Sequence, residues 1–255
     1  MDRISNTYRR RGTWRTLGPA SVVLAVALAS GCAREADPAG EHYRQEESID
    51  SLGTGKFYLD REIARIRPHR EVASWLDRPE RELAEFPERL VKALELQPSD
   101  VVADIGAGTG YYTFRIAENV PQGRVLAVDI QPEMLADLRR KAEEEGFSNV
   151  QVIRGSEDDP NLPAATVDVV LIVGSCHEFY YPYEMMRGIE IALVPGGRLF
   201  LAEYRGEDDT LPLSPLHRIS QEQARKEMEY VGLEWERTLD ILPRQHLMIF
   251  RKPLQ

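Results

Sequence analysis

The sequence is poor in cysteine and in long apolar runs. Only Cys32 and Cys176 occur among the 255 residues. A disulfide framework needs more cysteines than this, so disulfides do not build the fold. The longest apolar stretch, Ala20 to Ala29, has ten residues, whereas a helix that crosses a bilayer needs about 20. The sequence therefore predicts no transmembrane helix.

The first 31 residues have the pattern of a secretory signal. Five arginines, from Arg3 to Arg15, precede the short apolar stretch, and Ser30-Gly31-Cys32 follows it. A cysteine directly after small residues resembles the lipobox of bacterial lipoproteins. That resemblance implies that Cys32 is lipidated and that the chain is anchored in the cell envelope, outside the inner membrane or in the outer membrane. A cleavable signal with a chance cysteine is the alternative.

Basic residues are also in the minority. Lys and Arg number 32 against 42 Asp and Glu, and removing residues 1–31 changes the formal charge from -10 to -14. Such an acidic surface repels phosphate backbones, which argues against a nucleic-acid partner. Residues 32–55 contain few apolar side chains, so we expect a disordered, lipid-anchored tether there. The remaining chain is long enough for one substantial core.

A glycine-rich turn follows the apolar run from Val101 to Ile105. Gly106, Gly108 and Gly110 alternate with other residues, and a helix can begin directly after them. Such a turn brings backbone amides to a ligand at the carboxyl end of a parallel strand. Glycines in a tight strand-to-helix turn can also serve the fold alone, and this reading stays open.

A second apolar run, Gly123 to Val128, ends at Asp129. A carboxylate at the end of the next strand of a βαβ unit can accept hydrogen bonds from both hydroxyls of a ribose. The segments D-I-G-A-G-T-G (104 to 110) and V-D-I (128 to 130) closely resemble the first two motifs of the class I S-adenosylmethionine-dependent methyltransferases. The glycine spacing differs from the G-x-G-x-x-G of dinucleotide-binding proteins.

This resemblance implies an α/β fold over residues 98–255, with S-adenosylmethionine as cofactor. The fold would be a Rossmann-like, mostly parallel sheet of seven strands in the order 3-2-1-4-5-7-6, with helices on both faces and an antiparallel last strand. An acidic side chain after the third strand would hold the adenine amino group, but the sequence does not decide between Glu157 and Asp158. The predicted cofactor-binding residues are Asp104, Gly106, Ala107, Gly108, Gly110, Asp129, Ile130, Glu157, Asp158 and Gly174.

Residues 56–97 are predicted to form a helical extension ahead of that domain. Asp77 can cap one helix, and Pro87 to Leu96 reads as another. The segments G-K-F-Y, R-E-I and W-L-x-R-P-E-R-E resemble those of uncharacterised bacterial methyltransferases. These helices either lid the pocket, with Tyr58 and Trp75 lining it, or merely cover the edge of the sheet.

The later elements are predicted from apolar patterns and their stop signals. Helices are expected at 132–145, 185–193 and 220–230, and strands at 149–153, 167–173, 198–203, 234–239 and 245–250.

The chemistry is expected where the fourth strand of the sheet ends, at Gly174 to Tyr181. A histidine beside a carboxylate is a natural base for an oxygen nucleophile, so His177 and Glu178 are the candidate catalytic pair. The alternative is that His177 is a satisfied buried group and Glu178 favours the start of a helix. The side chains Glu203, Tyr204 and His217 can face the same pocket. No motif for a metal ion is apparent.

Three functions are compatible with these residues. The first is methyl transfer to a small-molecule or lipid-like acceptor. The second is a non-catalytic protein of the cell envelope that binds the nucleotide, because S-adenosylmethionine is made in the cytoplasm. The third, a nicotinamide-dependent oxidoreductase, is disfavoured by the glycine spacing.

Overall fold

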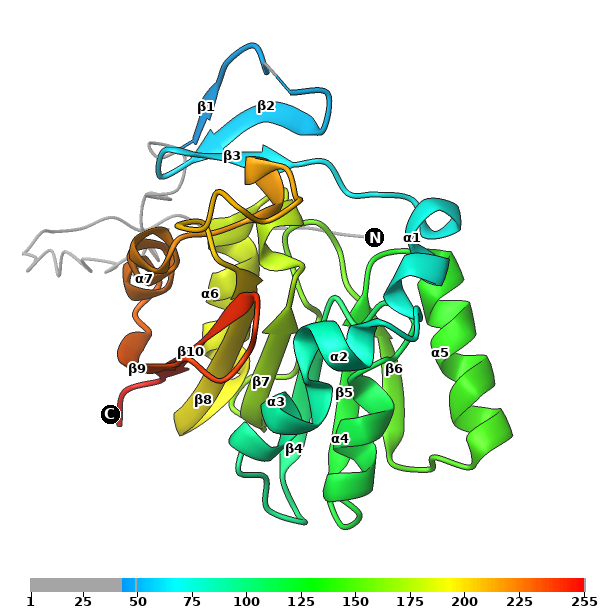
Figure 1. The fold of residues 1–255 in the computed structure, drawn as a ribbon. Helices are drawn as coiled ribbons and strands as arrows, with labels where there is room; N and C mark the ends of the chain where they lie inside the picture. Colours follow the sequence, from blue (N-terminus) through cyan, green and yellow to red (C-terminus); the bar gives the residue numbers. More distant parts are fainter. Residues whose placement is uncertain (1–42, 49, 255) are drawn as a thin grey trace, which may run out of the picture. The chain divides into compact units, whose positions relative to one another are not determined.

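The computed structural model describes residues 43–48 and 50–254, and its main feature is a seven-stranded sheet (Figure 1). The strand order is β6-β5-β4-β7-β8-β10-β9. Numbered within this sheet, the order is 3-2-1-4-5-7-6, so the predicted Rossmann-like topology is confirmed. The strands are β4 (Val101–Ile105), β5 (Arg124–Asp129), β6 (Val150–Arg154), β7 (Val167–Val173), β8 (Leu193–Tyr204), β9 (Glu234–Leu239) and β10 (Gln245–Arg251).

The five strands from β6 to β8 are parallel, whereas β10 is antiparallel to both of its neighbours. Central parallel strands are covered on both faces and therefore need nearly continuous apolar runs. Strand β7 shows this clearly, because Val169 to Ile172 are at most 1% exposed. Its carboxyl end lies at the same edge of the sheet as that of β4, where the glycine-rich turn begins.

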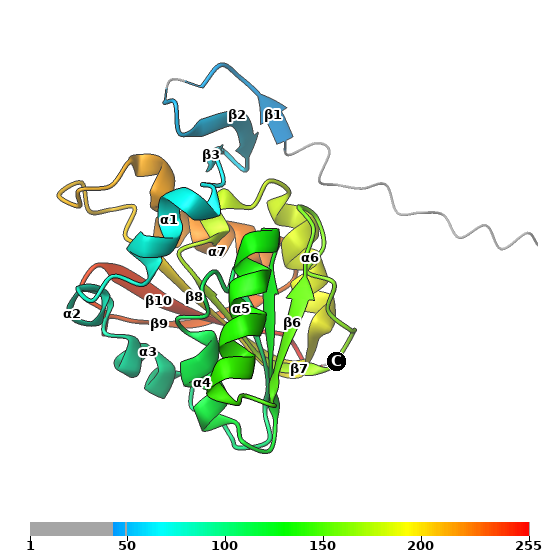
Figure 2. The ribbon, with the colours of Figure 1, turned by 90° about the vertical axis from the view of Figure 1, so that its right-hand side faces the viewer.

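Helices cover both faces of the sheet (Figure 2). Residues of α3 (Pro87–Ala93) and α4 (Thr113–Asn119) pack in one apolar cluster, and those of α6 (Pro182–Ala192) and α7 (Gln221–Tyr230) pack in the other. Helix α5 (Pro132–Glu145) has the predicted bounds, and Gly146 ends it in the left-handed region. Within the described residues, no helix has the length and apolarity to span a membrane.

The predicted tether is wrong over its last part. Strands β1 (Tyr43–Gln45), β2 (Gly53–Tyr58) and β3 (Arg61–Ala64) form a separate antiparallel sheet where disorder and then helix were expected. Tyr58, Leu59 and Ile63 form its apolar cluster, against which aromatic side chains of α6 and α7 pack. These partners are distant in sequence, so composition alone did not reveal that this segment has something to bury against. The signal, Cys32 and the tether as far as residue 42 lie outside the described residues.

The helical extension begins later than expected, with α1 (His69–Leu76) and α2 (Arg81–Glu85). Asp77 was predicted to cap the start of a helix, but it follows the end of α1. Its carboxylate instead accepts hydrogen bonds from Thr109 Oγ1 at 2.6 Å and Lys141 Nζ at 3.3 Å. Asp77 therefore ties the end of α1 to the glycine-rich turn.

Candidate functional site

The glycine-rich turn joins β4 to α4 and depends on left-handed backbone angles. Gly106, Gly108 and Gly110 have φ of 72°, 56° and 88°. A Cβ on Gly106 would also lie 2.5 Å from Ser175 Oγ. The turn is fixed to the end of β5, because the amides of Gly106 and Ala107 donate to the Val128 carbonyl. Glycine is thus required here for both backbone angle and space.

Asp129 is held at the end of β5 by the backbone. Its Oδ2 accepts from the Gly108 amide at 2.9 Å, and its Oδ1 accepts from the Gln131 amide at 2.9 Å. The side chain is 9% exposed, and this burial raises the pKa of the carboxyl, opposed by the amides. The remaining lone pairs of a fixed carboxylate are suited to accept from a diol.

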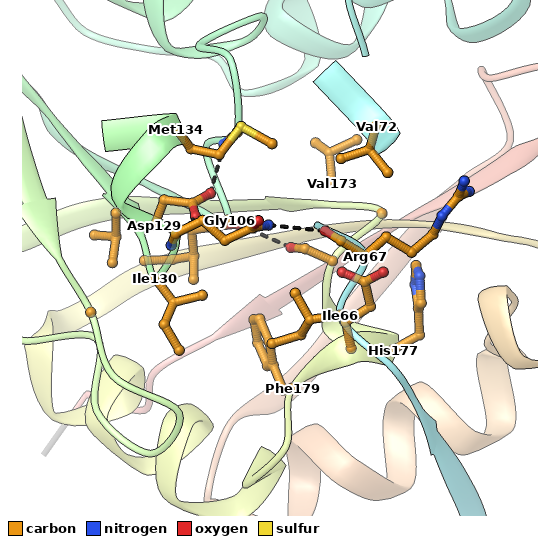
Figure 3. Close-up of a pocket in the computed structure, with 18 of the residues that line it drawn as sticks. Ile66, Arg67, Val72, Gly106, Asp129, Ile130, Met134, Val173, His177 and Phe179 are labelled. Carbon is orange, nitrogen blue, oxygen red and sulfur yellow. Dashed lines mark hydrogen bonds between the residues drawn. The ribbon is translucent and has the colours of Figure 1, made fainter. Parts of the chain in front are cut away.

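A pocket lies over the carboxyl ends of β4, β5 and β7 (Figure 3). Eight of the twelve predicted site residues line it. These are Gly106, Gly108, Asp129, Ile130, Glu157, Gly174, His177 and Glu178. The structure thus brings both predicted halves of the site, cofactor and catalytic, into one pocket.

The other four predicted residues do not line this pocket. Asp104 is buried below the turn and accepts from Thr113 Oγ1 at 2.6 Å, and burial raises its pKa to about 6. Ala107 packs in an apolar cluster with Leu135 and Leu138 of α5, and Gly110 lies against Phe114 and Leu138. Asp158 accepts from Ser156 Oγ at 2.6 Å and lines only an adjoining depression, so Glu157 is the better candidate to contact adenine.

His177 contacts a different carboxylate from the one predicted. It lies in a short 3-10 helix (Cys176–Glu178) after β7, and its Nδ1 is 3.0 Å from Glu203 Oε2. Glu203 is fully buried on β8, and its Oε1 accepts from the Cys176 amide at 2.9 Å. The neighbouring Glu178 does not make this contact, because Nδ1 of His177 faces Glu203 instead.

The buried environment of His177 acts on its pKa in two directions. Burial alone lowers the pKa of the ring, but the Glu203 carboxylate more than compensates, so the pKa is raised. When Nδ1 of a histidine is hydrogen-bonded to a carboxylate, Nε2 remains available to contact a ligand. His177 also has its carbonyl fixed, since Arg61 Nη1 donates to it at 3.2 Å while the same guanidinium binds Glu227.

The structure places His217 at this end of the pocket. As expected, Tyr204 and His217 line the pocket, while Glu203 lies behind His177. The His217 and His177 ring centroids are 5.0 Å apart. Burial lowers the pKa of His217 to about 4, assisted by the positive charges of His177 and Arg67, so the ring is neutral at pH 7. Cys176 is inert there, because burial raises its thiol pKa.

Several lining residues were not predicted because they come from the segment ahead of the sheet. Ile66, Arg67 and Val72 line the pocket, and so does Trp75, as one of the two hypotheses for this segment predicted. Tyr58 does not, since it is buried in the N-terminal sheet. Helix α1 therefore covers the pocket, whereas α3 packs on the sheet. Only the apolar spacing of Ile66, Val72 and Trp75 hinted at this.

Comparisons with known proteins agree with the geometry. Residues 96–245 match a family model described as a methyltransferase domain. An uncharacterised methyltransferase-like protein of Schizosaccharomyces pombe is 32% identical over 141 residues, covering 55% of this chain and 52% of the relative. The aklanonic acid methyltransferase of Streptomyces sp. strain C5 is 36% identical over 95 residues, covering 37% and 42%.

A solved structure gives the same result for the fold. The crystal structure of an S-adenosylmethionine-dependent methyltransferase from Aquifex aeolicus aligns with a TM-score of 0.68 at 24% identity, covering 73% of this chain and 99% of that one. The chain spans about half the length of the two curated relatives named above. The family-model match over residues 96–245 includes most of the residues that line the pocket.

Proposed function

The chain belongs to the class I S-adenosylmethionine-dependent methyltransferases, and on that premise we propose that it methylates a hydroxyl oxygen of a small, largely apolar acceptor. One observation carries the proposal: the free side of a buried, carboxylate-held His177 opens into the same pocket as the glycine-rich turn and Asp129. Cofactor groups and an activating side chain thus lie in one cavity.

The cofactor occupies the Asp129 end of the pocket. The methionine portion lies against the bare backbone of the turn at Gly106 and Gly108, where a side chain would block it, and Asp129 accepts from the ribose hydroxyls. Ile130 packs on the adenine, whose amino group reaches Glu157. Figure 3 supports this arrangement, since Asp129 and Ile130 lie together at one end of the pocket and His177 at the other.

The acceptor then lies between the sulfonium and His177. Apolar side chains dominate this part, including Ile66, Val72 and Phe179. The acidic lining residues Asp129, Glu157 and Glu178 outnumber the single arginine, which disfavours a phosphate-bearing acceptor. The acceptor oxygen gives its proton to Nε2 of His177 and attacks the methyl carbon, while the carbon–sulfur bond breaks and its electron pair stays on sulfur. Holding the two reactants in line is the main contribution of the protein.

Turnover is tested first by incubating the purified protein with methyl-deuterated S-adenosylmethionine and small-molecule extracts, then searching for deuterated products by mass spectrometry. With the acceptor known, His177→Gln should lower kcat by roughly 100-fold and leave cofactor affinity nearly unchanged. The Tyr58→Phe variant, which changes a buried residue outside the pocket, is the matched control.

A purely structural His177 predicts a different result. In that case His177→Gln lowers the unfolding temperature, and kcat per folded molecule equals that of the parent. Cofactor binding without any product in the extract search would support the non-catalytic function instead.

A further inference from the structure

The acceptor end of the pocket contains an unassigned cluster of donor atoms. One nitrogen each from His177 and His217 and one carboxylate oxygen of Glu178 lie within 4.8 Å of one another. His177 and Glu178 come from the loop after β7, and His217 from the short 3-10 helix Pro215–His217. From these residues we infer that this methyltransferase binds a divalent transition-metal ion here, on which the acceptor oxygen of the proposed reaction is activated.

The surroundings of His177 fit a metal ligand. Histidine ligands commonly give their second ring nitrogen to a carboxylate, which fixes the tautomer and aims the ligating nitrogen. Glu203 makes this contact with Nδ1 of His177 at 3.0 Å and is itself fully buried and anchored by the Cys176 amide. The Nε2 lone pair of His177 is therefore directed away from Glu203 and remains available to a cation.

His217 supplies a second, independent observation. Its Nε2 is buried and has no hydrogen-bond partner in the described part of the chain. A buried polar atom of this kind needs a partner, because leaving it unsatisfied costs about 1–3 kcal/mol. A metal ion shared with His177 and Glu178 provides that partner. Donors bind zinc at about 2.0–2.2 Å, so the three donor atoms must move slightly closer together to share one ion.

The charges at this end of the pocket favour a dication. Glu178, Glu203 and Asp50 contribute three negative charges, and Arg67 contributes one positive charge. Arg61 is already paired with Glu227 through two hydrogen bonds. A divalent ion therefore offsets the net negative charge of the cluster.

The donor set indicates the class of metal. Two imidazoles and one carboxylate suit zinc, iron(II), cobalt(II) and similar ions, whereas magnesium and calcium prefer oxygen ligands. Three protein ligands leave positions open for the acceptor, as in catalytic zinc sites. An acceptor hydroxyl bound to the ion releases its proton to solvent, and the resulting oxyanion attacks the methyl carbon of the sulfonium. This chemistry rests on the proposed function, but binding of the ion does not.

The test uses the full chain, without a histidine tag and treated with a chelator, titrated with Co²⁺ and followed by visible absorption. The parent should bind one Co²⁺ per chain, displaced by Zn²⁺ but not by Mg²⁺. Affinity should fall at least about 100-fold in His217→Ala and in Glu178→Gln, and about 10–100-fold in Glu203→Gln. The matched control is His69→Ala, because His69 pairs with Asp137 outside the cluster.

Binding of S-adenosylmethionine, measured by calorimetry on each variant, shows that the variants are folded and separates the two proposals. A parent that binds the cofactor but no Co²⁺ overturns the metal site and leaves His177 as a direct base. Equal Co²⁺ affinity in the parent and in the folded His217→Ala and Glu178→Gln variants also overturns it. A parent that binds Co²⁺ but no S-adenosylmethionine contradicts the proposed function and not the metal site.

Discussion

Asp129 combines two tasks at the scale of a single residue. Its carboxylate is fixed by the amides of Gly108 and Gln131, so the same side chain orients the glycine-rich turn and faces the pocket. Because those amides leave lone pairs free, the carboxylate can also accept from a ribose. Cofactor binding should therefore depend strongly on this residue.

We predict that Asp129→Ala lowers the affinity for S-adenosylmethionine at least tenfold. Hydrogen bonds to a charged group contribute about 1.5–3 kcal/mol each, partly compensated by water in the variant. Isothermal titration calorimetry measures the change. Asp137→Ala is the control, since Asp137 lies on α5 outside the pocket, where its carboxylate binds His69 and Arg140. Unchanged affinity in folded Asp129→Ala would remove the ribose assignment.

Asp104 should make stability depend on pH. Burial raises its folded pKa to about 6, against about 3.9 in an unfolded chain. The folded state therefore binds more protons between these values, so stability falls as pH rises from about 4 to 6. Above pH 6 the ionised Asp104 lowers the free energy of unfolding by its full amount, up to about 3 kcal/mol from the difference in pKa.

The variant Asp104→Asn should lose this dependence, because its side chain does not ionise. Chemical denaturation at several pH values measures it, and the difference in unfolding free energy between parent and variant isolates Asp104 from the other carboxyls. Relative to the variant, the parent should become less stable as pH rises from 4 to 7. A difference that stays constant over this range would show that burial does not shift the pKa of Asp104.

At the scale of elements, the glycine-rich turn is the junction on which the site depends. It connects β4 to α4, is bonded to the end of β5, and touches the loop after β7 through Ser175. A change of backbone angle there moves the glycine backbone that lines the pocket. Gly146 at the end of α5 has a similar φ but does not line the pocket, so it serves as a comparison.

We expect Gly106→Ala and Gly146→Ala to share the cost of an unfavourable backbone angle but to differ in binding. Both glycines have positive φ, 72° and 78°, where a Cβ costs about 1–2 kcal/mol. Only the Gly106 substitution also crowds Ser175, whereas Gly146 has no atom near the added Cβ. Calorimetry should show at least tenfold weaker S-adenosylmethionine binding in Gly106→Ala alone. Equal affinity in the two variants would mean that the turn does not contact the cofactor.

The N-terminal sheet contributes to the site at the same scale. Arg61 on β3 joins Glu227 on α7 and the carbonyl of His177, in a pair whose side chains are 10% and 1% exposed. The 3-10 helix that presents His177 and Glu178 is thus supported from two elements distant in the sequence. A segment predicted to be tether and helix therefore helps to position the candidate catalytic residues.

At the scale of the whole molecule, we propose that the chain is anchored in the cell envelope by a lipid on Cys32. Five arginines ahead of a short apolar stretch support export. One acyl chain gives only marginal binding, so the anchor requires the multiple chains typical of bacterial lipoproteins. We expect Cys32→Ser to move the protein from the membrane fraction to the soluble fraction on cell fractionation. A serine variant that stays in the membrane, or a precursor kept in the cytoplasm, would refute the proposal.

The sequence by itself determined the doubly covered sheet and the place at its edge of the residues predicted to bind the cofactor. Apolar runs such as Val167 to Val173, stop signals such as Gly146 and the cap at Ser220 are local, and each acts within a few residues. The glycines and Asp129 are equally readable, because one turn and one strand end bring them together. These features do not depend on what the rest of the chain does.

Only the tertiary structure decided the partner of His177, the proximity of His217 to Glu178, and the strands β1 and β2 in the segment predicted to be a tether. Each depends on contacts between residues far apart in the chain, such as Glu203 on β8 or the aromatic residues of α6 and α7 beneath β2. These distant neighbours decide that Glu203 holds the His177 ring. They also give the N-terminal sheet an apolar surface to pack against. No periodicity within a short window contains that information, since it is created when distant strands and loops meet.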